Sequence, residues 1–259
     1  MPVKVAVTGA AGRMGKLIVK NVVEDEELEL AQAFDVREVG RDAGELAGVG
    51  SVGVPIIHAS ELESKLNADV LVDFTAADAA VENICIAAKK GVKLVVGTTG
   101  FTDEHWKRIK ECCSVPAVIS PNFSVGVNVF WEIIKKCAEL LGSYDLEVLE
   151  IHHRFKKDAP SGTALKAVEI LKEVVGERKV VMGRNGICPR EDEIGVFAIR
   201  GGDVVGEHTV FFIGMGERIE ITHRAWSRQA FAGGAIKAVK WISKVEEPGI
   251  YGMKDVLGL

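Results

Sequence analysis

The sequence predicts an α/β protein in which a Rossmann-like domain with a parallel sheet is joined to a smaller α+β domain. Two observations predict the first domain: apolar runs alternate with helical segments up to residue 120, and a glycine-rich turn follows the first run. A third observation predicts the second domain, because strand-like runs separated by glycines, with few helices among them, follow residue 125. With 259 residues, 47% of them hydrophobic, the chain can bury a core in each domain.

The elements of the first domain are apolar runs that end in polar or glycine turns. The β-branched run Val3–Val7 ends at such a turn, and Met14, Leu17 and Ile18 then recur at helical spacing. Because strands alternate with helices, we expect right-handed crossovers and a parallel sheet. Further strands are expected at Leu28–Phe34, Val70–Phe74, Lys93–Val96 and Ala117–Ile119, with helices at Ala79–Lys90 and Asp103–Cys112.

The second domain is expected to begin with a long helix, Val125–Leu141, followed by a strand at Asp145–His152. A helix at Ala164–Val175 precedes strands at Ile194–Ile199, Glu207–Ile213 and Arg218–His223. The last helix, Phe231–Ser243, is expected to return to the first domain, which would make that domain discontinuous in sequence. The predicted domains are therefore residues 1–124 with 228–259 for the dinucleotide, and residues 125–227 for substrate and oligomer contacts.

Composition excludes several classes of function. The 32 basic and 37 acidic side chains give a net charge of −5, which argues against nucleic-acid and anionic membrane partners. The longest stretch without charged side chains, residues 112–131, contains Pro116, Pro121 and Asn122 and is therefore not expected to span a membrane. Five cysteines without a C-x-x-C pair predict reduced thiols in a cytoplasmic protein, with no metal site. The first residues lack a signal-peptide pattern, which also favours the cytoplasm.

A glycine motif after the first strand predicts a dinucleotide site. Gly9, Gly12 and Gly15 allow a tight turn and a close approach of the backbone to a pyrophosphate at the start of a helix. Asp35 lies 20 residues after Gly15 at the end of the second strand, where a carboxylate can bind a ribose diol. The alternative interpretation is a tight turn without a ligand. Asp35 should repel a 2′-phosphate, whereas Arg37 could pair with one, so NADH is favoured and NADPH stays possible.

A dense polar segment, residues 150–164, predicts a site for a small polyanion. His152 and His153 end a strand, and a histidine can deliver a proton near neutral pH. Lys156 adds a cation, and Ser161, Gly162 and Thr163 open a helix whose N–H groups can bind a carboxylate. The alternative is that Ser161 only caps the helix and that the basic residues form a solvated loop.

Polar turns also follow two other strands of the first domain. Asp73–Thr75 and Gly97–Gly100 should face the same crevice, because parallel sheets bind ligands beyond the carboxyl ends of their strands. Each could instead be only a polar turn. The isolated histidines His58, His105 and His208 are expected to be structural.

With these motifs the sequence resembles the 4-hydroxy-tetrahydrodipicolinate reductases, long called dihydrodipicolinate reductases, over nearly the whole chain. The most specific match is the His-His-Arg segment that leads to Asp158-Ala159-Pro160-Ser161-Gly162-Thr163. The other motifs that carry the resemblance are Val7–Gly15, Asp73–Thr75, Gly97–Gly100, Asn122–Asn128, Gly206–Thr209 and Asp255–Leu257.

The resemblance implies a role for each matching residue. The implied catalytic residues are His152, as the general acid, and Lys156, which would also bind the substrate. The implied substrate-binding residues are His153, Thr99, Ser161, Gly162 and Thr163. The implied cofactor-binding residues are Gly9, Ala10, Gly12, Arg13, Met14, Asp35, Phe74, Thr75, Gly97, Thr98, Thr99, Pro121, Asn122 and Phe123.

The resemblance also implies the reaction and the assembly. NADH or NADPH would reduce a small cyclic dicarboxylate, 4-hydroxy-2,3,4,5-tetrahydrodipicolinate, with loss of water, in the biosynthesis of lysine and diaminopimelate. The implied assembly is a homotetramer. Phe155 stands where many relatives carry a third histidine, and Val36 where NADPH-using relatives often carry arginine. The alternatives are another two-domain nicotinamide dehydrogenase and a nicotinamide-sensing protein without catalysis.

Overall fold

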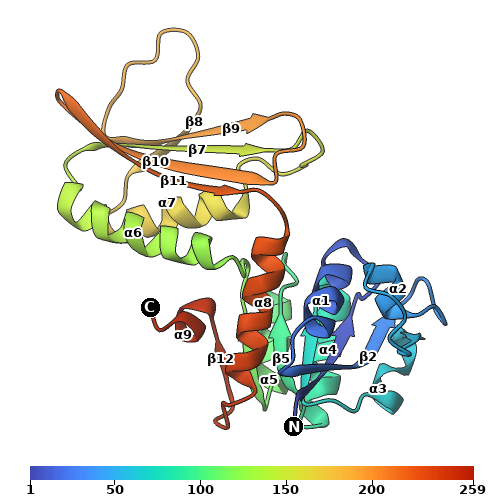
Figure 1. Cartoon of the computed structure of the whole chain (residues 1–259). Coiled ribbons are helices and arrows are strands. Elements are labelled where there is room, and N and C mark those ends of the chain that lie inside the picture. The colour runs from blue at the N-terminus through green and yellow to red at the C-terminus, as the bar shows by residue number, and fades with distance from the viewer. The chain divides into compact units, whose positions relative to one another are not determined.

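The chain forms two compact units, shown in Figure 1. The computed structural model describes all 259 residues. Unit 1 comprises Met1–Val125 and Phe231–Leu259, and unit 2 comprises Gly126–Ala230. Both ends of the chain therefore contribute to unit 1, and unit 2 is inserted between them.

Unit 1 is built on a seven-stranded sheet in which every neighbouring pair is parallel. The strand order is β12-β6-β5-β4-β1-β2-β3. The strands are β1 (Val3–Thr8), β2 (Leu28–Asp35), β3 (Ile56–His58), β4 (Val70–Asp73), β5 (Lys93–Val96), β6 (Pro116–Ile119) and β12 (Gly249–Tyr251). The expected Rossmann-like architecture is confirmed. The two edge strands, β3 and β12, were not expected, because their three residues include polar or glycine positions and are mostly not buried, so they form no recognisable apolar run.

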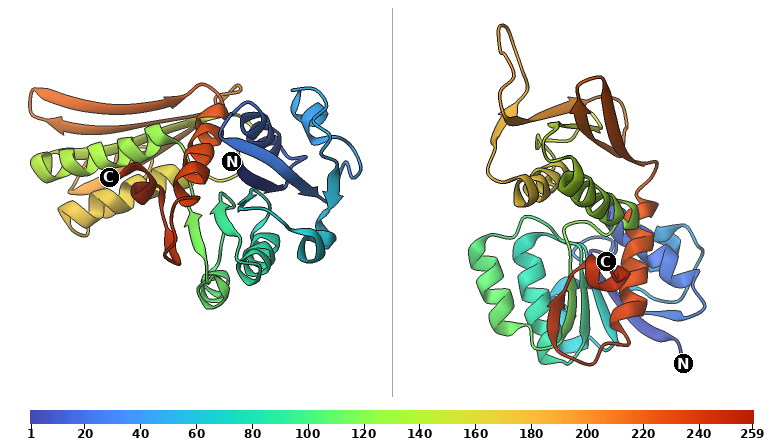
Figure 2. Two further views of the ribbon diagram at one scale, coloured as in Figure 1. Left: turned by 60° about the horizontal axis from the view of Figure 1, so that its bottom comes forward. Right: turned by 90° about the vertical axis from the view of Figure 1, so that its left-hand side faces the viewer.

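Helices cover both faces of this sheet, as Figure 2 shows. Val5 and Val7 belong to the same apolar cluster as residues of α1 and α8, whereas Ala6 belongs to the cluster formed with α4 and α5. This alternation is the period of two that a strand imposes on its side chains. The helical segments of unit 1 are α1 (Arg13–Val23), α2 (Ala43–Ala47), η1 (Ala59–Glu61), α3 (Leu62–Lys65), α4 (Ala77–Lys89), α5 (Asp103–Cys112), α8 (Gln229–Ile242) and α9 (Met253–Leu257).

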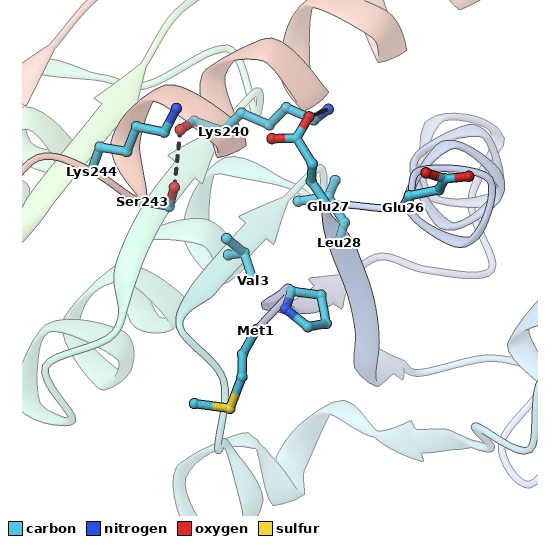
Figure 3. A pocket seen from close by; sticks show the side chains of 9 residues that line it. Met1, Val3, Glu26, Glu27, Leu28, Lys240, Ser243 and Lys244 are labelled. Carbon is cyan, nitrogen blue, oxygen red and sulfur yellow. Dashed lines mark hydrogen bonds and ion pairs between the residues drawn. The ribbon is translucent and has the colours of Figure 1, made fainter.

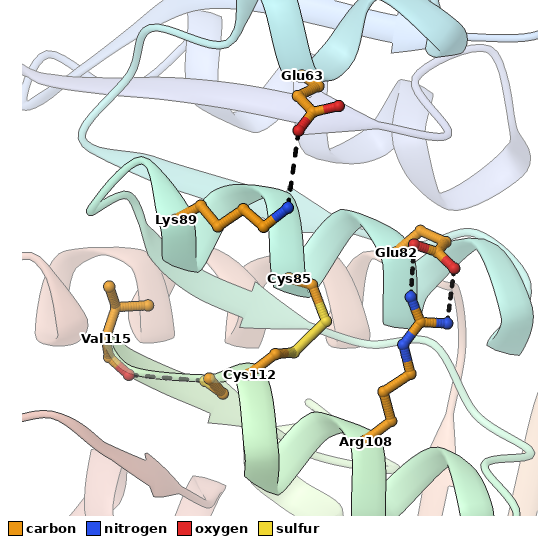
Figure 4. Close-up of a disulfide and its surroundings, with 8 residues drawn as sticks. Glu63, Glu82, Cys85, Lys89, Arg108, Cys112 and Val115 are labelled. Atoms are coloured by element: carbon orange, nitrogen blue, oxygen red, sulfur yellow. Dashed lines mark hydrogen bonds and ion pairs between the residues drawn. A yellow bond between two sulfur atoms is a disulfide. The ribbon is translucent and has the colours of Figure 1, made fainter.

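A disulfide joins two of these helices (Figure 4). Cys85 in α4 and Cys112 at the end of α5 are bonded, with their Cα atoms 5.3 Å apart. The expectation that all five cysteines are reduced thiols is therefore wrong for this pair. The cysteines lie 27 residues apart, and only the packing of α4 beside α5 brings them together. Cys113, Cys137 and Cys188 are free thiols.

Unit 2 has a five-stranded mixed sheet with helices on one face (Figure 1). The strand order is β11-β10-β7-β9-β8, in which β7–β9 and β8–β9 are parallel and the other pairs antiparallel. The elements are α6 (Val125–Leu141), β7 (Asp145–His152), α7 (Gly162–Val175), β8 (Lys179–Met182), β9 (Glu193–Arg200), β10 (Gly206–Gly214) and β11 (Glu217–Ala225). The short edge strand β8 was not expected.

The helix-covered face of this sheet changes along β7 from apolar to polar side chains. Leu146 and Val148 are buried in the apolar core of unit 2 with residues of α6 and α7. Glu150 and His152 continue the same alternation, so they are buried on the same face as that core. The core thus ends in a polar cluster at the carboxyl end of β7. Across the whole chain, no helix combines the length and the apolar character that crossing a membrane requires.

Candidate active site

The predicted dinucleotide turn in unit 1 has the geometry of an anion cradle. Gly9 has a φ of +73°, and a Cβ atom there would lie 2.5 Å from the Phe74 carbonyl oxygen. At Gly15 a Cβ atom would lie 2.0 Å from the Gly9 carbonyl oxygen, so neither position accepts a side chain. Helix α1 begins at Arg13, and its N-cap, Gly12, provides no side chain to bind the first N–H groups. These groups therefore have room for an anionic ligand.

Asp35 connects the end of β2 to the glycine turn. The carboxylate accepts hydrogen bonds from the Ala11 backbone N–H at 3.0 Å and the Arg37 backbone N–H at 2.9 Å. The side chain of Arg37 is two-thirds exposed, with its Nε atom 3.7 Å from Asp35. A cavity of about 400 Å³ opens here, at the carboxyl ends of β1, β2 and β4. Five of the predicted cofactor residues line it, namely Gly9, Gly12, Asp35, Phe74 and Thr75.

A fully buried carboxylate, Asp73, organises this edge of the sheet. It accepts hydrogen bonds from the hydroxyl groups of Thr8 and Thr98, both at 2.7 Å. It also accepts bonds from the Thr75 hydroxyl at 2.9 Å and the Asn83 amide at 2.7 Å. Asp73 therefore binds β1, α4 and the turn after β5 to its own strand. The structural roles of Thr8 and Asn83 were not expected from the sequence.

The predicted residues near the nicotinamide end lie around two phenylalanine rings. Phe74 and Phe123 have ring centroids 5.9 Å apart. A Cβ atom at Gly97 would lie 2.2 Å from the Phe74 ring, so this ring depends on the glycine for its place. Pro121 and Asn122 precede Phe123 in the loop after β6. The predicted cofactor residues that do not line the cavity are Ala10, Arg13, Met14, Gly97, Thr98, Thr99, Pro121, Asn122 and Phe123.

A second cavity in unit 1, of about 510 Å³, lies at the opposite edge of the sheet (Figure 3). Val3 and Leu28, which begin β1 and β2, line it together with Glu27 and Lys240. Lys240 is paired with Asp25 at 2.7 Å and with Glu27 at 2.6 Å, so its charge is already neutralised. Ligands of parallel sheets bind at the carboxyl ends of strands, and this cavity lies at the amino ends.

In unit 2, His152 lies at the carboxyl end of β7 with its side chain only 11% exposed. Its Nδ1 atom is 2.5 Å from a carboxylate oxygen of Glu150 and donates a hydrogen bond to it. This contact leaves Nε2 as the ring nitrogen available to a ligand. Gly206 borders this nitrogen, since a Cβ atom at Gly206 would lie 3.0 Å from it.

Glu150 is fully buried, and its carboxylate has hydrogen-bond partners in addition to His152. The guanidinium of Arg200 donates to both carboxylate oxygens, at 2.7 and 2.8 Å, and the Ser161 backbone N–H donates to one of them at 3.1 Å. Burial by itself would raise the pKa of Glu150, but the hydrogen bonds from His152 and Arg200 outweigh it and lower the pKa to about 2. The carboxylate is therefore ionised at neutral pH.

Ser161 caps the helix that follows. It is 2% exposed, and its hydroxyl accepts a hydrogen bond from the Ala164 backbone N–H at 3.3 Å. The hydroxyl also lies 3.0 Å from Nε2 of His208. Burial, together with the neighbouring His152, lowers the pKa of His208 to about 3, so this imidazole is neutral at physiological pH. The capping alternative for Ser161 describes its position in the structure, and its role in binding substrate stays a prediction.

The remaining predicted substrate residues of unit 2 surround the loop between β7 and α7. Lys156 donates hydrogen bonds to both oxygens of Asp158, at 2.8 and 2.9 Å. The hydrogen bond from Lys156 lowers the pKa of Asp158. His153 has a buried Nδ1 atom with no hydrogen-bond partner in the structure. Gly162 and Thr163 form the first turn of α7. Thr99, the remaining predicted substrate residue, is exposed in unit 1.

Three residues of this cluster were missed in the sequence. Glu150 could have been found, because residues two apart on a strand share a face and His152 was already a candidate. The place of Arg200 and His208 could not be predicted, because they reach the cluster through strand pairing, although His208 lies in the Gly206–Thr209 segment that carries the resemblance. Arg200 is the register partner of His152 on β9, and His208 is the register partner of Glu150 on β10.

Comparison with known proteins finds relatives over nearly the whole chain. Two family models match, "Dihydrodipicolinate reductase, N-terminus" over residues 3–123 and "Dihydrodipicolinate reductase, C-terminus" over residues 126–257. A 4-hydroxy-tetrahydrodipicolinate reductase of Archaeoglobus fulgidus is 60% identical, with 98% of this chain and 99% of that protein covered. One of Methanosarcina acetivorans is 53% identical, with 99% and 100% covered.

A solved structure is similar along its whole length. The dipicolinate-bound dihydrodipicolinate reductase of Paenisporosarcina sp. TG-14 superposes with a TM-score of 0.77 at 25% sequence identity. The similarity covers 97% of this chain and 98% of that one. The matches of sequence and structure thus extend over both units, and the chain belongs to the dihydrodipicolinate reductase family.

Proposed function

We propose that this chain is a 4-hydroxy-tetrahydrodipicolinate reductase. It would reduce 4-hydroxy-2,3,4,5-tetrahydrodipicolinate to tetrahydrodipicolinate, with loss of water, in lysine and diaminopimelate biosynthesis. The observation that carries the proposal is the polar cluster at the end of the unit 2 core. There the ring of His152 is held by the carboxylate of Glu150, two residues earlier on β7. Lys156 and the start of α7 follow closely in the sequence. The full-length relatives with that name support it.

The residues of unit 1 fit a nicotinamide dinucleotide. The space that Gly9 and Gly15 leave, and the uncapped start of α1, suit a pyrophosphate. Asp35 would bind the adenosine ribose, and Phe74 would lie toward the nicotinamide. When bound, the reduced nicotinamide supplies the hydride. We favour NADH over NADPH, because Asp35 disfavours a 2′-phosphate and Val36 provides no cation, although Arg37 is exposed beside the cavity.

His152 would act as the general acid. Because Nδ1 is bound to Glu150, Nε2 is the atom that would give a proton to the substrate. The carboxylates of the substrate would bind the N–H groups of Gly162 and Thr163 at the start of α7, with Lys156 as a cationic partner and His153 as a further contact. Clamping both carboxylates would hold the ring in the orientation that hydride transfer requires.

We also propose that the chain forms a homotetramer through the sheet face that carries no helices. Leu149, Phe197 and Ile199 alternate with the buried positions of β7 and β9, and a cavity of about 660 Å³ lies over them. Ile199 and Met182, which both line this cavity, are 47% and 59% exposed, so apolar side chains are grouped on this face, as at an interface. A cytoplasmic location stays a prediction. Disulfides are rare in most cytosolic proteins and common in the intracellular proteins of hyperthermophiles, so a cytoplasmic location with this bond intact would predict a heat-adapted source.

The test is oxidation of NADH and NADPH, followed by absorbance. The substrate is generated in place from pyruvate and aspartate semialdehyde by the preceding enzyme of the pathway. We expect turnover that pyridine-2,6-dicarboxylate, a planar mimic of the substrate, inhibits. Turnover with other substrates only would favour a different dehydrogenase. Cofactor binding without any turnover would favour a sensing protein.

The role of His152 is tested in the same assay. The His152→Gln variant should lower kcat by about 10²- to 10⁴-fold, the usual contribution of a positioned acid, because glutamine cannot deliver the proton. Its affinity for NADH, measured by calorimetry, should equal that of the unchanged protein. A variant with full turnover would remove His152 from proton transfer.

A further inference from the structure

We propose that Glu150 is a positioning residue that fixes the ring of His152 for proton transfer and ties it to the first turn of α7. This inference rests on the proposed function and deepens it, because it gives Glu150 a measurable part in catalysis and couples the ring of His152 to the anion site at the start of α7. The geometry that points to it is the convergence of three donors on one buried carboxylate.

The contacts of Glu150 connect three elements. One oxygen accepts hydrogen bonds from His152 on β7, at 2.5 Å, and from Arg200 on β9, at 2.8 Å. The other accepts from Arg200 at 2.7 Å and from the Ser161 backbone N–H at 3.1 Å. The Ser161 contact lies directly before α7, where the substrate carboxylate is proposed to bind. Movement of the carboxylate would therefore disturb both the acid and the anion site.

The contact with Glu150 also fixes the tautomer of His152. A carboxylate that accepts from Nδ1 keeps the proton on that atom, so the second proton of the imidazolium is held on Nε2. This is the nitrogen that Gly206 leaves uncovered. Without the carboxylate, the proton would distribute between both nitrogens and the ring could rotate. The carboxylate of Glu150 therefore determines that Nε2 is the nitrogen of His152 that donates the proton.

The groups around His152 leave it as the one imidazole of this face that is paired with a carboxylate. Glu150 on β7 and Arg200 on β9 form a neutral pair, and Lys156 and Asp158 form another in the following loop. The other imidazoles on this face are His208 on β10 and His223 on β11, and burial lowers the pKa of both. The start of α7 contributes no charged side chain. Of the three imidazoles on this face, His152 is the one whose ring bonds to the carboxylate of Glu150.

The test compares Glu150→Gln with Glu147→Gln. Both residues lie on β7 and bind arginine, Glu147 through Arg184 at 2.9 Å and through Arg190, but Glu147 lies on the opposite face and makes no contact with His152. Each variant keeps the shape of the side chain and loses an ion pair, so loss of stability is common to both. Only Glu150→Gln removes the charge that orders His152.

We expect Glu150→Gln to lower kcat by about 10- to 100-fold, since misplaced acid catalysis loses part of its usual contribution, while KM for NADH stays within a factor of about three. The neutral ring of His152 in this variant, followed by ¹⁵N NMR, should populate both tautomers, because no carboxylate accepts from Nδ1. Glu147→Gln, assayed as the assembled protein, should keep the kcat and the His152 tautomer of the unchanged chain. Equal losses of kcat in both variants, with the same tautomer of His152 in both, would overturn the proposal.

A measurement on the folded protein keeps the proposal testable if Glu150→Gln does not fold. ¹⁵N NMR of labelled histidine should show the neutral ring of His152 protonated at Nδ1 in the unchanged protein. A ring protonated at Nε2 would overturn the role of Glu150. This result does not depend on turnover, so failure of the reductase assay with an Nδ1-protonated ring would refute the proposed function alone.

Discussion

Gly206 shows how a single missing side chain defines a reactive position. A Cβ atom at Gly206 would lie 3.0 Å from Nε2 of His152, closer than ordinary van der Waals contact. At Gly201, five residues earlier, an added Cβ atom would have no other atom within 4 Å. Two neighbouring glycines therefore differ in their relation to the site, and only one of them is required by it.

The Gly206→Ala variant should lower kcat strongly, by about 10-fold or more, because even a small displacement of a catalytic group is costly. Gly201→Ala, which adds the same methyl group in open space, should behave like the unchanged protein. Both variants are compared by steady-state kinetics and by thermal melting. Equal activity of the two would show that the ring of His152 moves aside without cost.

His208 and Glu150 give the stability of the chain a defined dependence on pH. Both groups have a pKa that is lower in the folded protein than in the unfolded chain, so their stabilisation is complete above the unfolded value and is lost as the pH falls. For His208 the window runs from 6.5 down to about 3. For Glu150 it runs from 4.5 down to about 2. Between pH 6.5 and 4.5, His208 therefore contributes to the pH dependence of stability and Glu150 does not.

We expect the free energy of unfolding, measured in urea, to fall as the pH is lowered from 6.5 to 4.5. The His208→Asn variant should make this part of the curve less steep, because the unfolded chain then no longer gains a proton at this position, while His223, whose pKa burial also lowers, keeps its contribution. Below pH 4.5 both proteins should lose stability together through Glu150. An unchanged slope in the variant above pH 4.5 would show that His208 is not the group responsible.

At the scale of elements, two helices on one face of the unit 1 sheet are held by a covalent bond. Cys85 of α4 and Cys112 of α5 close a segment of 27 residues that contains β5. Ion pairs reinforce the contact, since Arg108 of α5 pairs with Glu82 of α4 (Figure 4). The bond therefore restricts the unfolded chain around one of the central strands.

Reduction of this disulfide should lower the free energy of unfolding by about 3 to 4 kcal/mol, the loop-closure value for a segment of this length. The Cys85→Ala variant should show a similar loss and no further effect of reductant. Cys113→Ser changes a free thiol beside the bonded Cys112 and should leave the response to reductant intact. A chain that melts at the same temperature with and without reductant would contradict the expectation.

The elements also show what the sequence can and cannot predict. Long strands and amphipathic helices were expected, because β1, α6 and α7 carry apolar residues at a clear period. The edge strands β3, β8 and β12 were missed, since three or four residues with partly exposed side chains leave no period to detect. The disulfide was missed because helix packing, rather than spacing along the chain, brings Cys85 and Cys112 together.

The same distinction applies to the site. His152, Lys156 and the start of α7 lie in one short segment, so the sequence alone placed them together. Arg200 and His208 join them only through the register of β7 with β9 and β10. A single sequence does not specify that register when each strand has several possible partners.

At the scale of the whole molecule, the open face of the unit 2 sheet gives the proposed tetramer a test. We expect light scattering to give four times the mass of the chain. The Ile199→Asp variant, which places a charge on the open face, should lower this mass. Leu140→Asp, on an apolar side chain of α6 that is 73% exposed, should leave the mass unchanged. A monomer in the unchanged protein would contradict the proposed assembly.

The contribution of both chain ends to unit 1 has a consequence during protein synthesis. The apolar cluster around Val5, Val7 and Val118 is completed by Ala235 and Val239 of α8, which leave the ribosome only after all of unit 2. At usual rates of translation this delay lasts about 5 to 20 seconds. During that time only α1 and α2 pack on this face of the first sheet, so the apolar side chains that α8 later covers are exposed to aggregation until the last helix arrives.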